Sequence, residues 1–291
     1  MPDAGVLVVG DAMLDVVAVS ETVAEISVAA LDYADAAIGM RAGGTGVNLA
    51  LEAARTGCTP VHLVCSLGHD TADRSADLAA RTVLGELERA GIAVTVNPAA
   101  GRPTGTAVIG YVADGSRIMF GAPGANEEPW SDGTAARARG ALASVRVLLV
   151  SGWMLFRPST RDDVRRLVRD AARLGVPVVL DVVPHAVHKA VSPEEFARLA
   201  ADVDYVSGSM HTLAGLLPRR PAHDHPKPVV EALLESFAGA LTYDDTGAFH
   251  LADRSGLSRS GDIPRPDRTA SLRGATDRFL VSALGDWVPG L

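Results

Sequence analysis

Five short, mostly apolar runs recur along the chain, and stretches with helical spacing lie between them. The runs occupy residues 6–9, 61–65, 145–150, 176–180 and 203–206 and are rich in Val and Leu. Their apolar residues are consecutive rather than strictly alternating, which is typical of strands covered on both faces. Strands that alternate with helices predict an α/β fold whose sheet is doubly wound and mostly parallel, with right-handed crossovers.

Helical spacing is clearest in two of the segments between these runs. Residues 45–56 place apolar side chains three and four positions apart, and Gly57 follows where a helix end is expected. After Thr160 a second segment has one apolar face, and Thr160 with Asp163 resembles a capping box. We therefore expect helices at both places, packed on the sheet.

Two stretches, residues 26–42 and 93–121, are rich in Val, Thr and Gly and lack helical spacing. They are predicted to form antiparallel strands, and the second contains a hairpin signal with a turn at 113–116. We expect a small β lid, contributed by about residues 16–42 and 93–121, that closes over a ligand at the edge of the sheet.

Composition and charge favour a small-molecule partner. The 291 residues are 47% apolar, and 27 Lys and Arg against 35 Asp and Glu give a formal net charge of −8. This balance, without a basic cluster, argues against nucleic-acid binding. No apolar run approaches the roughly 18 residues of a membrane span. Cys58 and Cys65 match no zinc or redox spacing and are expected to be buried and reduced, so we expect a cytoplasmic protein.

Polar residues near the N-terminus are the first candidates for chemistry. Asp11 and Asp15 follow the first predicted strand and either accept hydrogen bonds from ligand hydroxyls or cap a turn. The glycine-rich segment 41–48 (RAGGTGVN) allows backbone amides to approach a polar ligand, and Asn48 offers both a donor and an acceptor. The segment is neither a Walker A loop nor a dinucleotide-binding motif.

A second candidate lies at residues 274–277 (GATD), where an amphipathic helix is predicted to begin. Backbone N–H groups at this helix start can stabilise developing negative charge, and Asp277 is placed to accept a proton from an attacking hydroxyl. An acidic residue in a first turn also simply compensates the helix dipole, and that alternative stays open.

Other residues have both a structural and a functional interpretation. The run 153–156 (WMLF) is either core or a surface on which a ring stacks. His185 and His188 lack a third metal ligand nearby in sequence, so a surface loop is the simpler interpretation. His69 is kept as a candidate ligand contact.

Taken in order, these motifs resemble the ribokinase-like (PfkB) family of carbohydrate and nucleoside kinases over nearly the whole chain. The motifs are 10–15 (GDAMLD), 43–48 (GGTGVN), 66–70 (SLGHD), 124–128 (GANEE), Asp181 and 274–277 (GATD). The resemblance implies a single ribokinase-like α/β domain over residues 1–291, with a small β lid. It also implies transfer of the γ-phosphoryl group of ATP to a hydroxyl of a sugar or nucleoside-like substrate.

The resemblance assigns roles to individual residues. Asp277 is expected to be the catalytic base, and the amides of Gly274, Ala275 and Thr276 the anion hole. The residues expected to bind the acceptor substrate are Asp11, Asp15, Gly43, Gly44, Asn48 and His69. Those expected on the nucleotide side are Arg273, Thr242 and Gly247. Mg²⁺ is expected to bridge the nucleotide phosphates rather than occupy an all-protein site, and the lid is expected to form a homodimer.

Several positions depart from the family pattern on the nucleotide side. Residues 205–212 (YVSGSMHT) replace an Asn-x-x-Glu motif, 242–244 (TYD) replace Thr-x-Gly, and 271–273 (SLR) replace Asp-Thr-Thr. Thr276 replaces a glycine, and 14 residues follow Asp277, where the family generally continues with a helix and loop that cover the adenine. Three alternatives follow: a divergent kinase, a non-catalytic protein that binds a similar ligand or a partner, and an ATP-independent reaction in the same pocket.

Overall fold

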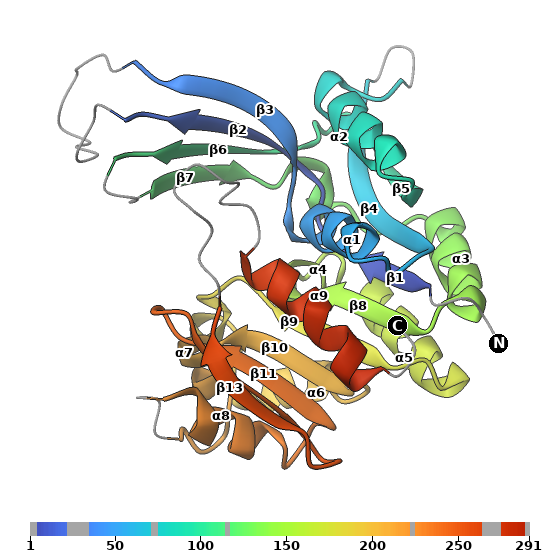
Figure 1. Cartoon of the computed structure of the whole chain (residues 1–291). Helices are drawn as coiled ribbons and strands as arrows, with labels where there is room; N and C mark the ends of the chain where they lie inside the picture. The colour runs from blue at the N-terminus through green and yellow to red at the C-terminus, as the bar shows by residue number, and fades with distance from the viewer. Residues whose placement is uncertain are drawn as a thin grey trace.

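Two sheets form the framework of the computed structural model, which describes residues 5–21, 35–70, 75–113, 117–221, 225–263 and 275–288 (Figure 1). The large sheet has the order β13 (Ser258–Asp262), β12 (Ala248–Asp253), β11 (Gly239–Tyr243), β10 (Tyr205–Ser209), β9 (Val178–Val182), β8 (Val147–Ser151), β1 (Val6–Val9), β4 (Val61–His69) and β5 (Ala93–Ala100). The strands from β5 to β11 are parallel, and β12 and β13 are antiparallel to their neighbours. This is the expected ribokinase-like, mostly parallel sheet.

Helices cover both faces of this sheet. They are α1 (Thr45–Arg55), α2 (Leu78–Arg89), α3 (Asp132–Ala141), α4 (Gly152–Phe156), α5 (Arg161–Leu174), α6 (Pro193–Leu199), α7 (Met210–Gly215), α8 (Pro226–Leu233) and α9 (Ala275–Trp287). Short 3-10 helices occur at η1 (Gly124–Glu127), η2 (Leu142–Ser144) and η3 (Val187–Lys189). Within the part of the chain that the structure describes, none of the helices has the length and apolar character needed to span a membrane.

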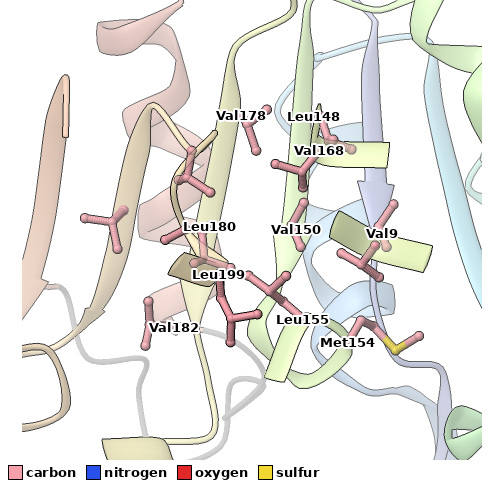
Figure 2. Packing of buried hydrophobic residues seen from close by; sticks show 14 of the residues in the cluster. Val9, Leu148, Val150, Met154, Leu155, Val168, Val178, Leu180, Val182 and Leu199 are labelled. Carbon is pink, nitrogen blue, oxygen red and sulfur yellow. The ribbon is translucent and has the colours of Figure 1, made fainter. Parts of the chain in front are cut away.

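The alternating side chains of each central strand supply two separate cores. Val9, Leu148, Val150 and Leu180 pack on one face with residues of α4 and α5, as Figure 2 shows. Val8 and its neighbours on the other face pack with residues of α1, α2 and α9. Because side chains alternate along a strand, a strand buried on both faces is apolar at consecutive positions. This confirms the strand predictions, whose ends differ from the observed ones by a few residues.

The predicted capping box before α5 is wrong. Thr160 precedes the helix, but its hydroxyl donates to the carbonyl oxygen of Met154 at 2.6 Å. Asp163 Oδ2 accepts instead from the backbone N–H of Trp130 at 2.9 Å. Both side chains are used in tertiary contacts, which the local sequence pattern does not encode.

A four-stranded sheet forms the lid and extends away from the large sheet (Figure 1). Its order is β3 (Ala37–Gly43), β2 (Met13–Val19), β6 (Gly105–Tyr111) and β7 (Arg117–Ala122). The β6–β7 pair is the predicted hairpin, but β2 and β6 are parallel. The second lid segment also begins later than expected, because β5 pairs in parallel with β4 in the large sheet. As an edge strand β5 is only partly buried and shows no continuous apolar run.

Candidate active site

A cavity of about 660 Å³ lies where the lid meets the carboxyl ends of β1 and β9. Much of its polar lining comes from four parts of the chain: β1–β2, the start of α1, the end of β9 and the start of α9. The side chains concerned are Asp11, Asp15, Asn48, Asp181, Thr276 and Asp277. Carboxyl ends of parallel strands are the usual ligand sites of open α/β sheets.

Asp11 is buried and holds the start of α1. Its Oδ2 accepts from the backbone N–H of Thr45 at 3.1 Å, and its Oδ1 accepts from Gly46 at 3.4 Å and from the Ser151 hydroxyl at 3.2 Å. Burial raises the pKa of Asp11, and these hydrogen bonds oppose that rise. The sequence left two roles open for Asp11, and these contacts make it a positioning residue for the helix.

The glycines of the 43–48 motif allow close backbone approach. Gly44 has a φ of +88°, and a Cβ there would lie 2.6 Å from the carbonyl oxygen of Asp11. A Cβ on Gly43 would lie 2.2 Å from the carboxylate of Asp15, so the glycine gives that side chain its place at the cavity. Arg41 Nε lies 3.9 Å from Asp15 Oδ2 on the same face of the lid.

Asp277 lies in the first turn of α9, which packs on α1. Its carboxylate is hydrogen-bonded to the side chain of Asn48. Burial, with the charges of Asp11 and Glu52, raises the pKa of Asp277 to about 7. Asn48 Oδ1 is buried without a hydrogen-bond partner among the described residues, and Asn48 lines the cavity. An acceptor and a carboxylate that titrates near neutral pH therefore lie side by side.

Asp181 lines the cavity beside Asp277, and Tyr243 lies near both carboxylates without lining the cavity. Burial, together with the charges of Asp277 and Asp11, raises the pKa of Asp181 well above its usual range. Burial also raises the pKa of Tyr243, whose hydroxyl is hydrogen-bonded to the side chain of Thr276. The threonine at this position thus bonds to the end of β11, a contact that a glycine cannot make.

The model of the pfkB family of carbohydrate kinases matches residues 3–243. The chain belongs to this family. The matched region ends with β11, so Asp277 is placed at the cavity by the fold and not by the match. No curated protein sequence matches the chain.

Solved structures of other kinases share the fold of this pfkB-family chain. The ribokinase of Arabidopsis thaliana, complexed with ribose and ATP, has a TM-score of 0.70 and 20% identity, with 100% of this chain and 88% of that chain covered. A probable sugar kinase from Rhizobium etli has a TM-score of 0.77 and 17% identity, covering 100% and 89%. The adenosine kinase of Sinorhizobium meliloti has a TM-score of 0.73 and 19% identity, covering 98% and 88%.

His69 is not at the cavity, contrary to the expectation. The N–H of Gly10 bonds to the carbonyl of Val64, and β4 continues from there to His69. Five residues of strand span about 16 Å, so the strand carries His69 past the cavity. Its backbone pairs with Ala76 instead.

Of the nucleotide-side candidates, Thr242 and Gly247 do not line the cavity either. The Thr242 hydroxyl donates to the carbonyl oxygen of Gly208 at 3.0 Å, and Gly247 lies in the β11–β12 turn with a φ of +94°. Asp244 accepts from the N–H groups of Thr246 and Ala248 at 2.8 and 3.0 Å, so its carboxylate closes this turn. Arg273 and Gly274 lie outside the described residues, as does the side chain of Ala275, and the expected anion hole therefore stays a prediction.

Asn126 and Arg157 line the cavity without a role assigned from the sequence, and Trp153 lies there as the partly exposed end of a run whose other residues are in the core. Asn126 Nδ2 donates to the carbonyl oxygen of Ala12 at 2.9 Å, and its Oδ1 accepts from the N–H of Ala12 at 3.1 Å. It therefore fixes the junction of β1 and β2, as a paired strand would. Trp153 and Arg157 also line the cavity, with the guanidinium carbon 5.9 Å from the indole centroid. Asn126 belongs to the 124–128 motif and Trp153 to the 153–156 run, so the sequence had indicated both positions.

Proposed function

We propose that the protein transfers the γ-phosphoryl group of ATP to a hydroxyl group of a sugar or nucleoside-like molecule bound in the cavity. The supporting observation is Asp277, a half-buried carboxylate with a pKa of about 7 that lines the cavity at the start of α9. A base whose pKa lies near neutral pH is suited to take a proton from an attacking hydroxyl. Membership of the pfkB family supports this class of reaction.

The chain's own residues bind the acceptor, orient it and move one proton. Asp15 from the lid and Asn48 from α1 bind acceptor hydroxyls. Asp277 takes the proton of the attacking hydroxyl, whose oxygen bonds to the γ-phosphorus while the bond from that phosphorus to the bridging oxygen of ADP breaks. The amides of Gly274, Ala275 and Thr276 stabilise the charge of the transferred group.

The residues at the floor are compatible with magnesium held mainly by nucleotide phosphates. The described residues contain no group of three or more His, Cys, Asp and Glu side chains that can hold a metal ion. Such an ion requires only one or two carboxylates, because phosphates and water supply its other ligands. We assign this role to Asp181, whose pKa is raised by burial and by the charges of Asp277 and Asp11. The ion neutralises phosphate charge when it is bound.

Titration of the purified protein with Mg-ATP by calorimetry tests this function first, with ADP and GTP as comparators. Magnesium-dependent binding is expected, followed by acceptor-dependent ADP formation in a screen of sugars and nucleosides. The absence of binding at millimolar nucleotide, with and without acceptors, would rule out the proposed reaction.

The nucleotide side supplies the observation that favours a second candidate. Thr242 and Asp244 are committed to contacts within the protein, and the family's Asn-x-x-Glu position holds Ser209, whose hydroxyl bonds to Thr212 at 2.7 Å. A non-catalytic protein that binds a sugar, a nucleoside-like ligand or a partner fits these contacts, as does ATP-independent chemistry at Asp277. Ligand affinity that is insensitive to Mg-ATP is the result expected of a binding protein.

A homodimer through the lid is also part of the proposal. Met40, Val16, Val108 and Phe120 lie in register across the four lid strands, on the face away from the cavity. Met40 is 66% exposed and Phe120 63%. A contiguous exposed apolar row of this kind marks an association site. The four residues of the row are uncharged, so two copies, each with a net charge of −8, can pair through it without bringing like charges of the row together.

A further inference from the structure

The cavity presents carboxylates on its floor and guanidinium groups on its wall, where Asp15 lies beside Arg41. Its floor presents the carboxylates of Asp181 and Asp277, which accept hydrogen bonds when ionised. Its wall presents Arg41, Arg117 and Arg157, which can only donate. A ligand that satisfies both ends needs hydroxyl donors at one end and oxygen acceptors at the other.

Arg157 is fixed in place with one edge of its guanidinium unused. Its Nη1 donates to Glu127 Oε1 at 2.9 Å, and its guanidinium carbon lies 5.9 Å from the Trp153 ring centroid. Its Nε is buried and has no hydrogen-bond partner among the described residues. The Nε and Nη2 edge of a guanidinium matches the two oxygens of a carboxylate or a phosphate.

Arg157 shares its ion-pair partner with a second arginine. Glu127 is shared with Arg102, whose Nη1 lies 3.2 Å from Glu127 Oε2 and whose Nε contacts Glu128. Arg41, on the lid side, resembles Arg157 in the state of its Nε. Its Nε is buried without a hydrogen-bond partner in the described structure, and 3.9 Å separates it from Asp15 Oδ2.

We infer that the molecule bound in this cavity carries an anionic group, a carboxylate or a phosphate, in addition to its hydroxyls, and that Arg157 binds that group. The inference rests on the proposed function, because it takes the cavity as the acceptor site. A neutral sugar offers only hydroxyl oxygens to the guanidinium, whereas an anionic group forms charge-assisted hydrogen bonds, which are roughly twice as strong. The acceptor class is therefore a sugar acid or a sugar phosphate.

Calorimetry without ATP tests the inference independently of catalysis. The probes are D-gluconate as a sugar acid, D-ribose 5-phosphate and D-fructose 6-phosphate as sugar phosphates, and D-glucose, D-ribose, D-fructose and adenosine as neutral ligands. At least one anionic probe is expected to bind ten or more times tighter than its neutral counterpart. The acid and phosphate arms distinguish the two anions.

Variants assign the effect to Arg157. Arg157→Gln should weaken binding of the anionic probe at least tenfold. The affinity for the neutral counterpart should stay within about twofold of the wild-type value. Arg157→Lys keeps the charge without the planar edge and should fall in between. Arg102→Gln is the matched control, because Arg102 contacts the same Glu127 but does not line the cavity, and it should leave the preference unchanged. A thermal melt of each variant verifies that it is folded.

Three results would overturn the inference: neutral ligands that bind as tightly as the anionic probes, an anion preference that survives in folded Arg157→Gln, or no binding of any anionic probe. Phosphorylation of a neutral sugar as efficient as that of its anionic counterpart would overturn it as well, while leaving the kinase function intact. Anion binding that depends on Arg157, without any turnover of ATP, would support the inference and rule out the proposed kinase function.

Discussion

Asp277 is the residue on which the proposed chemistry depends. Its carboxylate is hydrogen-bonded to Asn48 and has a pKa of about 7. Asp277→Asn should lower kcat by about 10²–10⁴-fold, because the variant keeps the shape of the side chain but cannot accept the hydroxyl proton. The measurement is acceptor-dependent ADP formation. Asp202→Asn, in an exposed turn, is the control, and equal turnover in Asp277→Asn and the control would remove Asp277 as the base.

The pH dependence follows from the same raised pKa. The proposed base acts when deprotonated, so kcat/KM should rise up to tenfold per pH unit below about 7 and level off above it. Stability should change in the opposite direction. The folded state holds the proton more tightly than the unfolded chain, so stability is present at low pH and lost as pH rises from about 4 through about 7.

The loss of stability is at most on the order of 4 kcal/mol, since one pKa unit corresponds to about 1.4 kcal/mol. Chemical denaturation across this pH range measures it. Asp277→Asn should flatten the curve, and a wild-type curve no steeper than that of the variant would contradict the raised pKa.

The sequence indicated several cavity residues correctly but could not assign their contacts. Asp15, Asn48 and Asp277 line the cavity, and each lies in a motif near the start of a strand or a helix. The helix-capping role of Asp11 depends on where α1 begins in space, which local sequence does not determine. The position of His69 depends on how far β4 continues, and that length is fixed by its pairing with β5.

At the scale of elements, the contact of β1 with α1 through two glycines determines where the cavity floor lies. A Cβ on Gly46 would lie 2.5 Å from backbone atoms of Gly10. Gly46→Ala should destabilise the fold by about 1–3 kcal/mol, because rigid backbone must move apart. Thermal unfolding is expected to show a decrease in Tm of a few degrees.

Gly85→Ala in α2 is the matched control for that substitution. A Cβ there has no atom within 4 Å, so the change should raise stability by about 0.4–1 kcal/mol through a less flexible unfolded chain. If Gly46→Ala also stabilised the protein, the close approach of α1 to β1 would not be the constraint described.

Helices and strands were predicted well where burial determines the pattern of apolar residues. They were predicted poorly where the neighbouring strand or a tertiary hydrogen-bond partner determines the structure. Strands β1, β4, β8 and β9 have apolar runs because helices cover both of their faces. The edge strand β5 has no such run and was assigned to the lid. The Thr160 capping box failed for a related reason, since tertiary acceptors and donors were preferred to the helix end.

At the scale of the whole molecule, the lid sheet has two faces with different chemistry. Asp15, Arg41 and Ala107 are in register on the cavity face, while the next row outward in each strand belongs to the opposite face. The base of the outer face is covered by α2, where Glu86 Oε1 accepts from the N–H of Ala42 at 2.8 Å. The uncovered apolar row lies farther out along the strands, so a partner can cover it without closing the cavity.

This geometry makes the dimer testable without touching the cavity. Phe120→Asp places a charge at the β7 end of the outer row, and burying an unpaired charge in an interface is costly. Light scattering coupled to size exclusion should give the mass of two chains for the wild type and of one chain for the variant. Leu174→Asp at the end of α5 is the control, because Leu174 is 59% exposed and lies far from the lid in the chain. A wild-type monomer, or a Phe120→Asp dimer as stable as that of the control, would show that the lid face is not where two copies associate.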